Sequence, residues 1–353
     1  MTKSIILNDT HMCVRNSSDV FIDYQRRFYQ DCLFPYMKEN GIDHIIHDGD
    51  YCEHRKHLNV KGVAANREHF LNPLLEYGFT MDVKPGNHDV YYKNTNKLCS
   101  LDLVFAGYDN VTLHHDPIIL QRGKKKLGFI PWITTDNYGQ CMSFLEAGEA
   151  DLILGHFEIA GFEMHAGVES THGMDTSSLH QYELVMSGHF HKKSQKGNIM
   201  YLGSQMEFTW ADADDPKYFH VLDWDTGEVE AVRVPLTMYK KVLYNDELND
   251  HLGTFNPDDY NDKFVKVVVV KKSNPYLFDK FIDKISECRY HDLKIAENFN
   301  DYSGDSVEEE IDFQDTSQLL NDYVEAVDTP LDRDRLKNIM QRLYTEAQNM
   351  DLQ

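Results

Sequence analysis

The stretch from Asp9 to His191 contains five short motifs rich in Asp, Asn and His. They are Asp9-Thr10-His11, Gly49-Asp50, Gly86-Asn87-His88-Asp89, Gly155-His156 and Gly188-His189-Phe190-His191. Each motif follows a short apolar run, at residues 4–7, 45–47, 79–83, 152–154 and 183–186. Short apolar runs that end in Gly, Asn or Asp are typical of strands covered on both faces. The sequence therefore predicts that the motifs lie on loops at one edge of a sheet.

The residue types in these motifs indicate a metal site. Carboxylates and imidazoles together suit Mn²⁺, Fe²⁺ or Zn²⁺, and one carboxylate can bridge two ions. None of the motifs contains Cys, which argues against a structural zinc finger. A lone His156 would more often be a buried histidine at a strand end. The order of the five motifs, each after a predicted strand, makes the metal site the stronger interpretation.

The chain has 353 residues, so we expect a main domain and a smaller one. Apolar residues make up 41% of the chain, which is enough to bury a core. Asp and Glu number 58 against 35 Lys and Arg, and the formal net charge is −23. This charge argues against a nucleic-acid binder held by bulk electrostatics. Any DNA affinity must come from metal ions and local basic patches.

Cysteine usage and hydropathy give an expectation for the compartment. The six cysteines lack the spacing of a disulfide framework, and no charged-then-apolar leader precedes them. We therefore expect a reduced, cytoplasmic environment. No apolar run approaches the roughly 20 residues that a membrane helix needs, so no membrane contact is expected.

Periodicity predicts several further elements before residue 235. A helix over residues 17–34 would carry Phe21, Tyr24, Phe28 and Cys32 on one stripe, and Pro35 should kink or end it. A second helix is expected from about Asn59 to Tyr77. Three strands at residues 111–113, 118–120 and 127–130 suggest an antiparallel meander, and two more strands between residues 217 and 234 close the domain.

A basic concentration follows the second motif. Arg55, Lys56 and Lys61 stand close to Asp50 in an otherwise acidic chain. A solvated surface is the simpler interpretation of such residues. Their position just after a predicted ligand favours contacts with a phosphate backbone, and we assign them as candidate DNA-binding residues.

The sequence beyond residue 235 changes character twice. Residues 236–299 predict a small α/β module with a strand at 264–270, a helix at 275–285 and a strand at 292–296. Residues 300–316 are acidic and are expected to form a linker. Residues 317–353 predict two amphipathic helices, whose apolar stripes require a partner. The alternative is that this helical pair folds back on the small module.

The five motifs resemble those of the calcineurin-type metallophosphoesterase superfamily, and more narrowly the nuclease subunit of the SbcCD-type double-strand-break repair complex and its tailed-phage relatives. The segments 201–204, 214–217 and 221–223 are similar to those that follow the last histidine in that branch. The resemblance covers residues 3 to about 235. It implies a four-layer αββα sandwich (residues 1–235) with a small α/β capping domain (236–299) and a C-terminal helical pair.

The resemblance also implies roles for individual residues. One ion would be held by Asp9, His11 and His191, the other by Asn87, His156 and His189, and Asp50 would bridge them. The ions would be Mn²⁺, with Mg²⁺ as the alternative. His88 would protonate the leaving 3′ oxygen or stabilise the transition state, without binding metal. Glu53 occupies a position where the family commonly has Asp or His, and the expectation is that it pairs with His88.

An activity and partners follow from the same resemblance. It implies a 3′–5′ exonuclease on duplex ends and an endonuclease on single strands, located in the host cytoplasm if the gene belongs to a phage. Helices near Phe21 would form a homodimer contact, and residues 317–350 would bind an SMC-like ABC ATPase of the SbcC type.

Two other functions stay open. The first is a nucleotide or phosphoprotein phosphatase of the same superfamily. The phosphoprotein branch has Gly-Asn-His-Glu at the third motif and Asp-Arg-Gly after the second, and this chain has neither. The second is a non-catalytic scaffold for the ATPase, which would have little reason to keep every ligand position filled.

Overall fold

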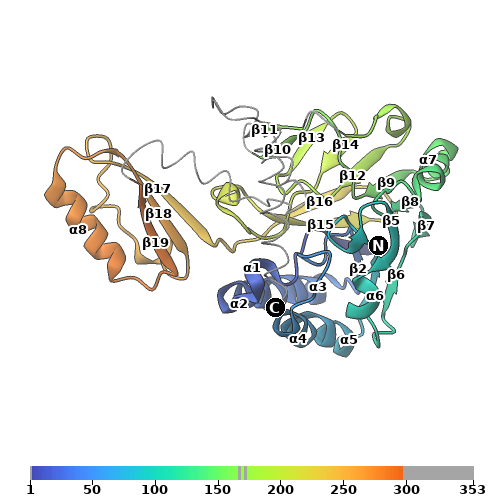
Figure 1. The fold of residues 1–353 in the computed structure, drawn as a ribbon, viewed down its shortest axis with the longest axis horizontal. Helices are drawn as coiled ribbons and strands as arrows, with labels where there is room; N and C mark the ends of the chain where they lie inside the picture. Colours follow the sequence, from blue (N-terminus) through green and yellow to red (C-terminus); the bar gives the residue numbers. More distant parts are fainter. Residues whose placement is uncertain (1, 166–167, 171–172, 297–353) are drawn as a thin grey trace, which may run out of the picture. The chain divides into compact units, whose positions relative to one another are not determined.

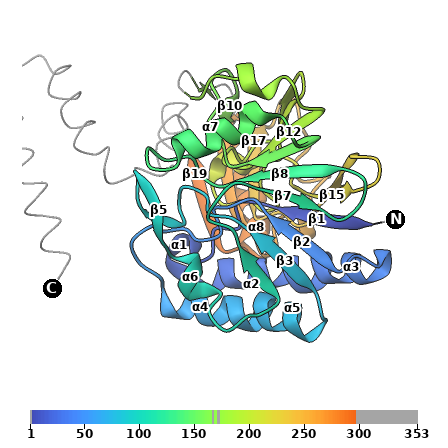
Figure 2. The ribbon, with the colours of Figure 1, turned by 90° about the vertical axis from the view of Figure 1, so that its right-hand side faces the viewer.

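Two six-stranded sheets lie face to face between two layers of helices, and Figure 2 shows the four layers edge-on. The computed structural model describes residues 2–165, 168–170 and 173–296 of the chain. The predicted αββα sandwich is confirmed in this part. The acidic linker and the helical pair expected for residues 300–353 lie outside the described residues.

The first sheet carries the first three motifs at its strand ends. Its strands in spatial order are β16 (Val229–Arg233), β15 (Tyr218–Asp223), β1 (Lys3–Leu7), β2 (His44–His47), β3 (Thr80–Val83) and β6 (Val111–Leu113). Strands β1, β2, β3 and β6 run parallel, and β15 is antiparallel to β1. β1 and β2 are covered on both faces, which explains the apolar Ile5, Ile6 and Leu7 of β1 and Ile45 and Ile46 of β2.

The second sheet carries the last two motifs. Its strands in spatial order are β13 (Ser194–Lys196), β14 (Ile199–Tyr201), β12 (Leu184–Ser187), β9 (Leu152–Gly155), β8 (Lys126–Ile130) and β7 (Ile118–Gln121). Ile6, Ile46, Leu154, Met186 and Trp224 belong to the core between the two sheets. Helix α7 (Tyr138–Ala147) covers the outer face of the second sheet (Figure 2).

Two long helical segments cover the outer face of the first sheet (Figures 1 and 2). One consists of α2 (Asp19–Arg27), a π-helical turn (Phe28–Leu33) and α3 (Phe34–Asn40); the other consists of α4 (Val60–Asn66), a second π-helical turn (Arg67–Leu71) and α5 (Asn72–Glu76). The Ser18 and Asn59 side chains cap the two starts by accepting hydrogen bonds from main-chain N–H groups. None of the described helices is long and apolar enough to cross a membrane.

The first of these segments corrects one expectation and confirms another. Pro35 does not end the helical segment: it directly follows the π-helical turn, and α3 continues to Asn40. Phe21, Tyr24 and Phe28 are at most 3% exposed, so this part of the stripe is core. The structure therefore leaves these three side chains no exposed surface for a homodimer contact.

The predicted antiparallel meander is wrong. β6 belongs to the first sheet, parallel to β3, whereas β7 and β8 form an antiparallel hairpin in the second. The connection between β6 and β7 crosses from one sheet to the other, and its His114 is bound to Asp82 of β3 at 2.7 Å. Strand pairing depends on such long-range contacts, which local patterns do not encode.

A third sheet is formed by β17 (Tyr239–Asn245), β18 (Phe264–Lys271) and β19 (Asp292–Ala296), and α8 (Pro275–Ser286) packs on it. Phe278, Phe281 and Ile285 of α8 are buried against this sheet. The strand, helix and strand predicted for this region are confirmed. The boundaries 236–299 of a separate capping domain stay a prediction. The remaining short α-helices and strands are α1 (Val14–Ser17), α6 (Leu101–Val104), β4 (Val90–Tyr92), β5 (Thr95–Cys99), β10 (Glu163–His165) and β11 (Val168–Glu169).

A buried ion pair joins the two large sheets beside the motif loops. Lys84, at the end of β3, lies 2.6 Å from Asp48 and donates hydrogen bonds to the carbonyls of Ile130 (2.5 Å) and Leu154 (2.8 Å) in the second sheet. Asp48 also accepts a hydrogen bond from the main-chain N–H of Gly188 at 2.7 Å. Both charged side chains are fully buried. These contacts fix how the strand ends of one sheet face those of the other.

We expect Lys84→Met to destabilise the protein by about 3–5 kcal/mol, because it leaves the Asp48 carboxylate buried without its partner. Urea denaturation followed by circular dichroism measures this change. Lys125→Met is the control, since Lys125 pairs with Glu183 at the surface and should change the unfolding free energy little. Equal midpoints for the two variants would contradict a sheet-joining role for Lys84.

Candidate metal centre

The five motifs meet at the facing edges of the two sheets. Those in the first sheet follow β1, β2 and β3, and the other two follow β9 and β12. The expectation of a single sheet edge is thus corrected, since each sheet supplies part of the site. Parallel strands within each sheet place their carboxyl ends on the same side, which brings distant motifs together.

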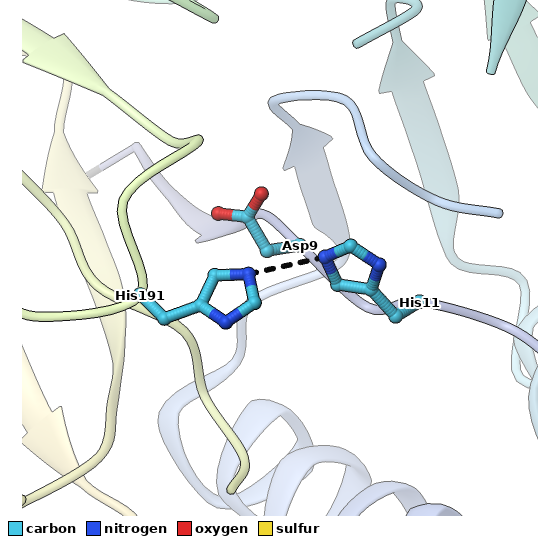
Figure 3. Close-up of side chains that lie close together, drawn as sticks. All are labelled: Asp9, His11 and His191. Atoms are coloured by element: carbon cyan, nitrogen blue, oxygen red, sulfur yellow. Dashed lines mark hydrogen bonds between the residues drawn. The ribbon is translucent and has the colours of Figure 1, made fainter. Parts of the chain in front are cut away.

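The first ligand group consists of Asp9, His11 and His191, one ligand atom of each lying within 4.8 Å of the others. Figure 3 shows the two imidazole rings turned toward each other beside the carboxylate. The Nε2 atoms of His11 and His191 are 3.1 Å apart. Two imidazole nitrogens at this separation can bind the same ion.

The second ligand group consists of Asp50, His156 and His189, with ligand atoms again within 4.8 Å of one another. His156 Nε2 lies 3.1 Å from Asp50 Oδ2. The amide oxygen of Asn87 lies 3.1 Å from His156 Nε2 and 3.1 Å from His189 Nδ1. Asp9 Oδ1 is 3.9 Å from His156 Nε2, so the two groups are contiguous.

The donor set fits two divalent cations. Two carboxylates, an amide oxygen and four imidazoles converge where Asp9 and His156 are fully buried and Asp50 is 2% exposed. Buried carboxylates require a compensating positive charge. Mixed oxygen and imidazole ligands suit Mn²⁺, Fe²⁺ or Zn²⁺. The assignment of the seven residues as ligands is a proposal that this geometry supports.

The pKa values of two proposed histidine ligands are shifted in opposite directions. Burial lowers the pKa of His189 to about 4, so its imidazole is in the neutral form that binds metal. Burial also disfavours the charged form of His156. The negative charges of Asp50, Asp9 and Asp48 outweigh this effect and raise the pKa of His156 to about 9. An ion must displace a proton from His156 at neutral pH, and metal affinity should therefore rise with pH.

The ligand loops have unusual backbone conformations. Asp9, His11, Asp50 and His189 have φ values of 46°, 45°, 48° and 81°, in the left-handed region that side chains rarely adopt. Such conformations cluster at functional sites, where surrounding structure holds them. Gly86 is required for space, because a Cβ there would lie 2.2 Å from Asp50 Oδ1.

His88 lies beside the first ligand group, its ring centroid 5.2 Å from that of His11. Its main-chain N–H donates to Asp50 Oδ1 at 2.8 Å, and its Nδ1 is 2.7 Å from the carbonyl oxygen of Glu53. A carbonyl can only accept, so Nδ1 carries a proton. Asp89 binds the main-chain N–H groups of Gly86 and Cys52, which ties the His88 loop to the Asp50 loop.

The expected pairing of the Glu53 carboxylate with His88 stays a prediction. The Glu53 carboxylate lies 2.8 Å from Nδ1 of His11, and the Glu53 main-chain oxygen lies 2.7 Å from Nδ1 of His88. The carboxylate thus fixes the ring of a proposed ligand whose Nε2 faces the site. We propose Glu53 as a positioning residue for His11, because such carboxylate–histidine pairs orient metal ligands.

We expect Glu53→Gln to weaken Mn²⁺ binding by about 10- to 100-fold, because the charged partner of His11 is lost. The hydrogen bond between the Glu53 main-chain oxygen and Nδ1 of His88 is retained in this variant. Isothermal titration calorimetry with Mn²⁺ measures the affinity, with the exposed Glu39→Gln as control. Unchanged Mn²⁺ affinity in Glu53→Gln would show that the carboxylate does not support the site.

The predicted DNA-binding residues remain a prediction. Lys61 forms an exposed ion pair with Asp19 at 2.7 Å, Lys56 is exposed, and Arg55 is half-buried. Lys192 and Lys193 directly follow His191 and are two further basic residues close in sequence to a proposed ligand.

Lys217, a buried residue that supports the last motif, was not predicted from the sequence. Lys217 is 3% exposed and donates a hydrogen bond to the carbonyl of His191 at 3.0 Å. Its ammonium group also pairs with Asp212 at 2.5 Å and Asp215 at 2.9 Å. Phe208 packs against both His11 and His191, with ring centroids 5.2 and 5.6 Å away. These contacts support the His11 and His191 side of the first ligand group.

The fold and this arrangement of ligands define a phosphoesterase, and the chain belongs to the calcineurin-like phosphoesterase family, whose model matches residues 2–193. The resemblance seen in the sequence is thereby confirmed. Members of this family use divalent metal ions.

Among individual proteins, the chain is similar to exonuclease subunit 1 of Enterobacteria phage T4. The two are 27% identical over 348 residues, which cover 98% of this chain and 99% of that protein. Weaker likenesses exist to solved structures. An archaeal phosphodiesterase is matched at a TM-score of 0.33 and 14% identity, over 66% of this chain and 100% of its own. GAP50, the inner-membrane-complex anchor of Plasmodium, is matched at a TM-score of 0.39 and 12% identity, over 67% and 90%.

Proposed function

We propose that this protein is a two-metal DNA phosphodiesterase that acts as a 3′–5′ exonuclease on duplex ends and as an endonuclease on single strands. The observation that carries the proposal is the convergence of two adjacent ligand groups beside His88. The near full-length similarity to a protein named as an exonuclease subunit favours DNA over other phosphoesters. Mn²⁺ is the proposed metal, with Mg²⁺ as the alternative.

Each ligand group would hold one ion, and Asp50 would contribute to both. Bound ions would supply a nucleophilic water at neutral pH and neutralise charge on the phosphodiester. Asp50 is oriented by the main-chain N–H of His88. The Glu53 carbonyl orients the His88 ring through Nδ1, and the proton for the leaving 3′ oxygen would come from Nε2 of the protonated ring.

The proposal is tested by cleavage assays on the purified chain with Mn²⁺, with and without EDTA. The substrates are end-labelled duplex, hairpin and single-stranded DNA, beside a generic phosphodiester, bis(p-nitrophenyl) phosphate. We expect EDTA-sensitive release of nucleotides from 3′ ends and cleavage within single strands. Hydrolysis of the generic ester without cleavage of any DNA would favour a small-molecule phosphoesterase. No hydrolysis of either would favour a scaffold.

We further propose that the chain works with an SMC-like ABC ATPase of the SbcC type in DNA recombination and repair, and that it forms a homodimer. Residues 317–350 would bind the ATPase through their apolar stripes. The support is the composition of this segment and the word subunit in the name of the phage relative. The described chain up to Ile295 forms one compact unit, so a truncated chain can test the assignment.

A chain that ends at residue 299 should keep Mn²⁺-dependent cleavage of single strands, because every proposed ligand is retained. It should fail to co-purify with the ATPase and should lose ATP-dependent processing of duplex ends. Affinity co-purification and an end-labelled duplex assay measure the two losses. Binding of the ATPase as tight as that of the full chain would contradict the role of residues 317–350.

A further inference from the structure

An aromatic side chain that has no part in metal binding or acid catalysis borders the second ligand group. The Trp132 ring centroid lies 5.7 Å from that of His189, with the planes at 41°, and 6.0 Å from that of His156, with the planes at 70°. Trp132 is half-buried. It therefore lies against two proposed ligands while part of its surface stays accessible.

The main chain of Trp132 is held on both sides. Its N–H donates to the carbonyl of Pro85 at 2.9 Å, just before the Gly86-Asn87-His88 loop. Its carbonyl accepts hydrogen bonds from the side-chain amides of Asn96 (2.8 Å) and Asn137 (3.0 Å). The indole is thus fixed relative to the loop that carries Asn87 and His88. Rigid placement of this kind lowers the entropy cost of binding a substrate group.

The other two tryptophans have structural surroundings. Trp224 is fully buried and donates from Nε1 to Ser4 at 2.7 Å. Trp210 packs against Tyr239 at 4.9 Å, with Lys266 over its ring at 4.9 Å. In the described part of the chain, Trp132 has no such hydrogen bond from Nε1.

We propose that Trp132 stacks on the nucleobase next to the scissile phosphate, an inference that rests on the proposed nuclease function. Aromatic side chains in single-strand binding sites stack on bases without sequence preference. A base must leave the duplex to stack in this way, so the contact favours frayed ends and single strands. Stacking also provides affinity that does not depend on positive charge, which suits a chain with a net charge of −23.

The alternative role for Trp132 is packing alone, in which the ring only shields His156 and His189 from water. Both roles predict slower cleavage when the ring is removed. They differ in whether the loss depends on the base of the substrate. A substrate that lacks one base therefore distinguishes them.

The test uses the full chain with Mn²⁺ and end-labelled single-stranded oligonucleotides, each with one abasic nucleotide at the first, second or third position from the 3′ end. Release of the 3′-terminal nucleotide is measured under single-turnover conditions. We expect the wild-type rate to fall by about 5- to 150-fold for an abasic nucleotide at one of these positions. Trp132→Ala should cleave intact DNA at this reduced rate, with no further loss when that base is missing.

Two variants and one measurement complete the experiment. Trp132→Phe should partly restore the dependence on the base, and Trp210→Ala should retain the wild-type pattern. The metal content of Trp132→Ala should equal that of the wild type by elemental analysis. The inference would be overturned if the rate losses caused by Trp132→Ala and by the missing base multiply when the two are combined. Loss of metal from Trp132→Ala would overturn it too. The nuclease function would stand in both cases. Failure of the wild-type chain to cleave any oligonucleotide would overturn both.

Discussion

Asp50→Asn should reduce Mn²⁺-dependent DNA cleavage by on the order of 10³-fold or more, because the neutral amide cannot serve as a carboxylate shared between two ions. Asn has the size of Asp and tolerates the positive φ of 48° at this position. The fold should therefore be kept, with an unchanged circular dichroism spectrum. The loss is measured by cleavage of end-labelled DNA, and bound Mn²⁺ is measured by elemental analysis.

Asp43→Asn is the matched control for this variant. Asp43 precedes β2, the strand that leads to Asp50, but its side chain is 72% exposed. We expect wild-type cleavage from Asp43→Asn. Wild-type cleavage from Asp50→Asn under the same Mn²⁺ concentration would rule out the two-metal assignment.

His88→Asn should lower the cleavage rate by about 10²- to 10⁴-fold, the range typical of general acid catalysis. The bound metal should stay at two ions per chain, because His88 lies beside the ligand groups and is not proposed as a ligand. Single-turnover cleavage and elemental analysis test the two expectations on the same preparation. His180→Asn, at an exposed position, is the control. Loss of one metal equivalent in His88→Asn would make His88 a ligand instead.

Local sequence patterns were sufficient to predict the strands that precede the motifs. β1, β2 and β9 are apolar runs buried on both faces, and each ends at a polar motif. Burial on both faces leaves a signature within a few residues, and no knowledge of the partner strand is needed. The helices capped by Ser18 and Asn59 were predictable because a cap residue and an apolar stripe are also local signals.

Long-range contacts were not predictable in this way. The pairing of β6 with β3 separates it from β7, its neighbour in sequence. The Glu53 carboxylate pairs with His11, a contact that depends on the geometry of two separate loops. Lys84 and Asp48 are ordinary charged residues in the sequence, yet they are buried because the two sheets bring them together. Such pairs can be identified only once the packing of the two sheets is known.

The left-handed backbone at four of the proposed ligands affects how loss-of-function variants should be interpreted. Alanine scanning assumes that truncating a side chain leaves the main chain untouched. At Asp9, His11, Asp50 and His189 an alanine would have to adopt a conformation that Asn and Asp tolerate far better. An inactive alanine variant could thus report a displaced loop as readily as a missing ligand. Asparagine is the cleaner probe at these four positions, and it also suits the preparation of an intact but inactive protein for trapping bound DNA.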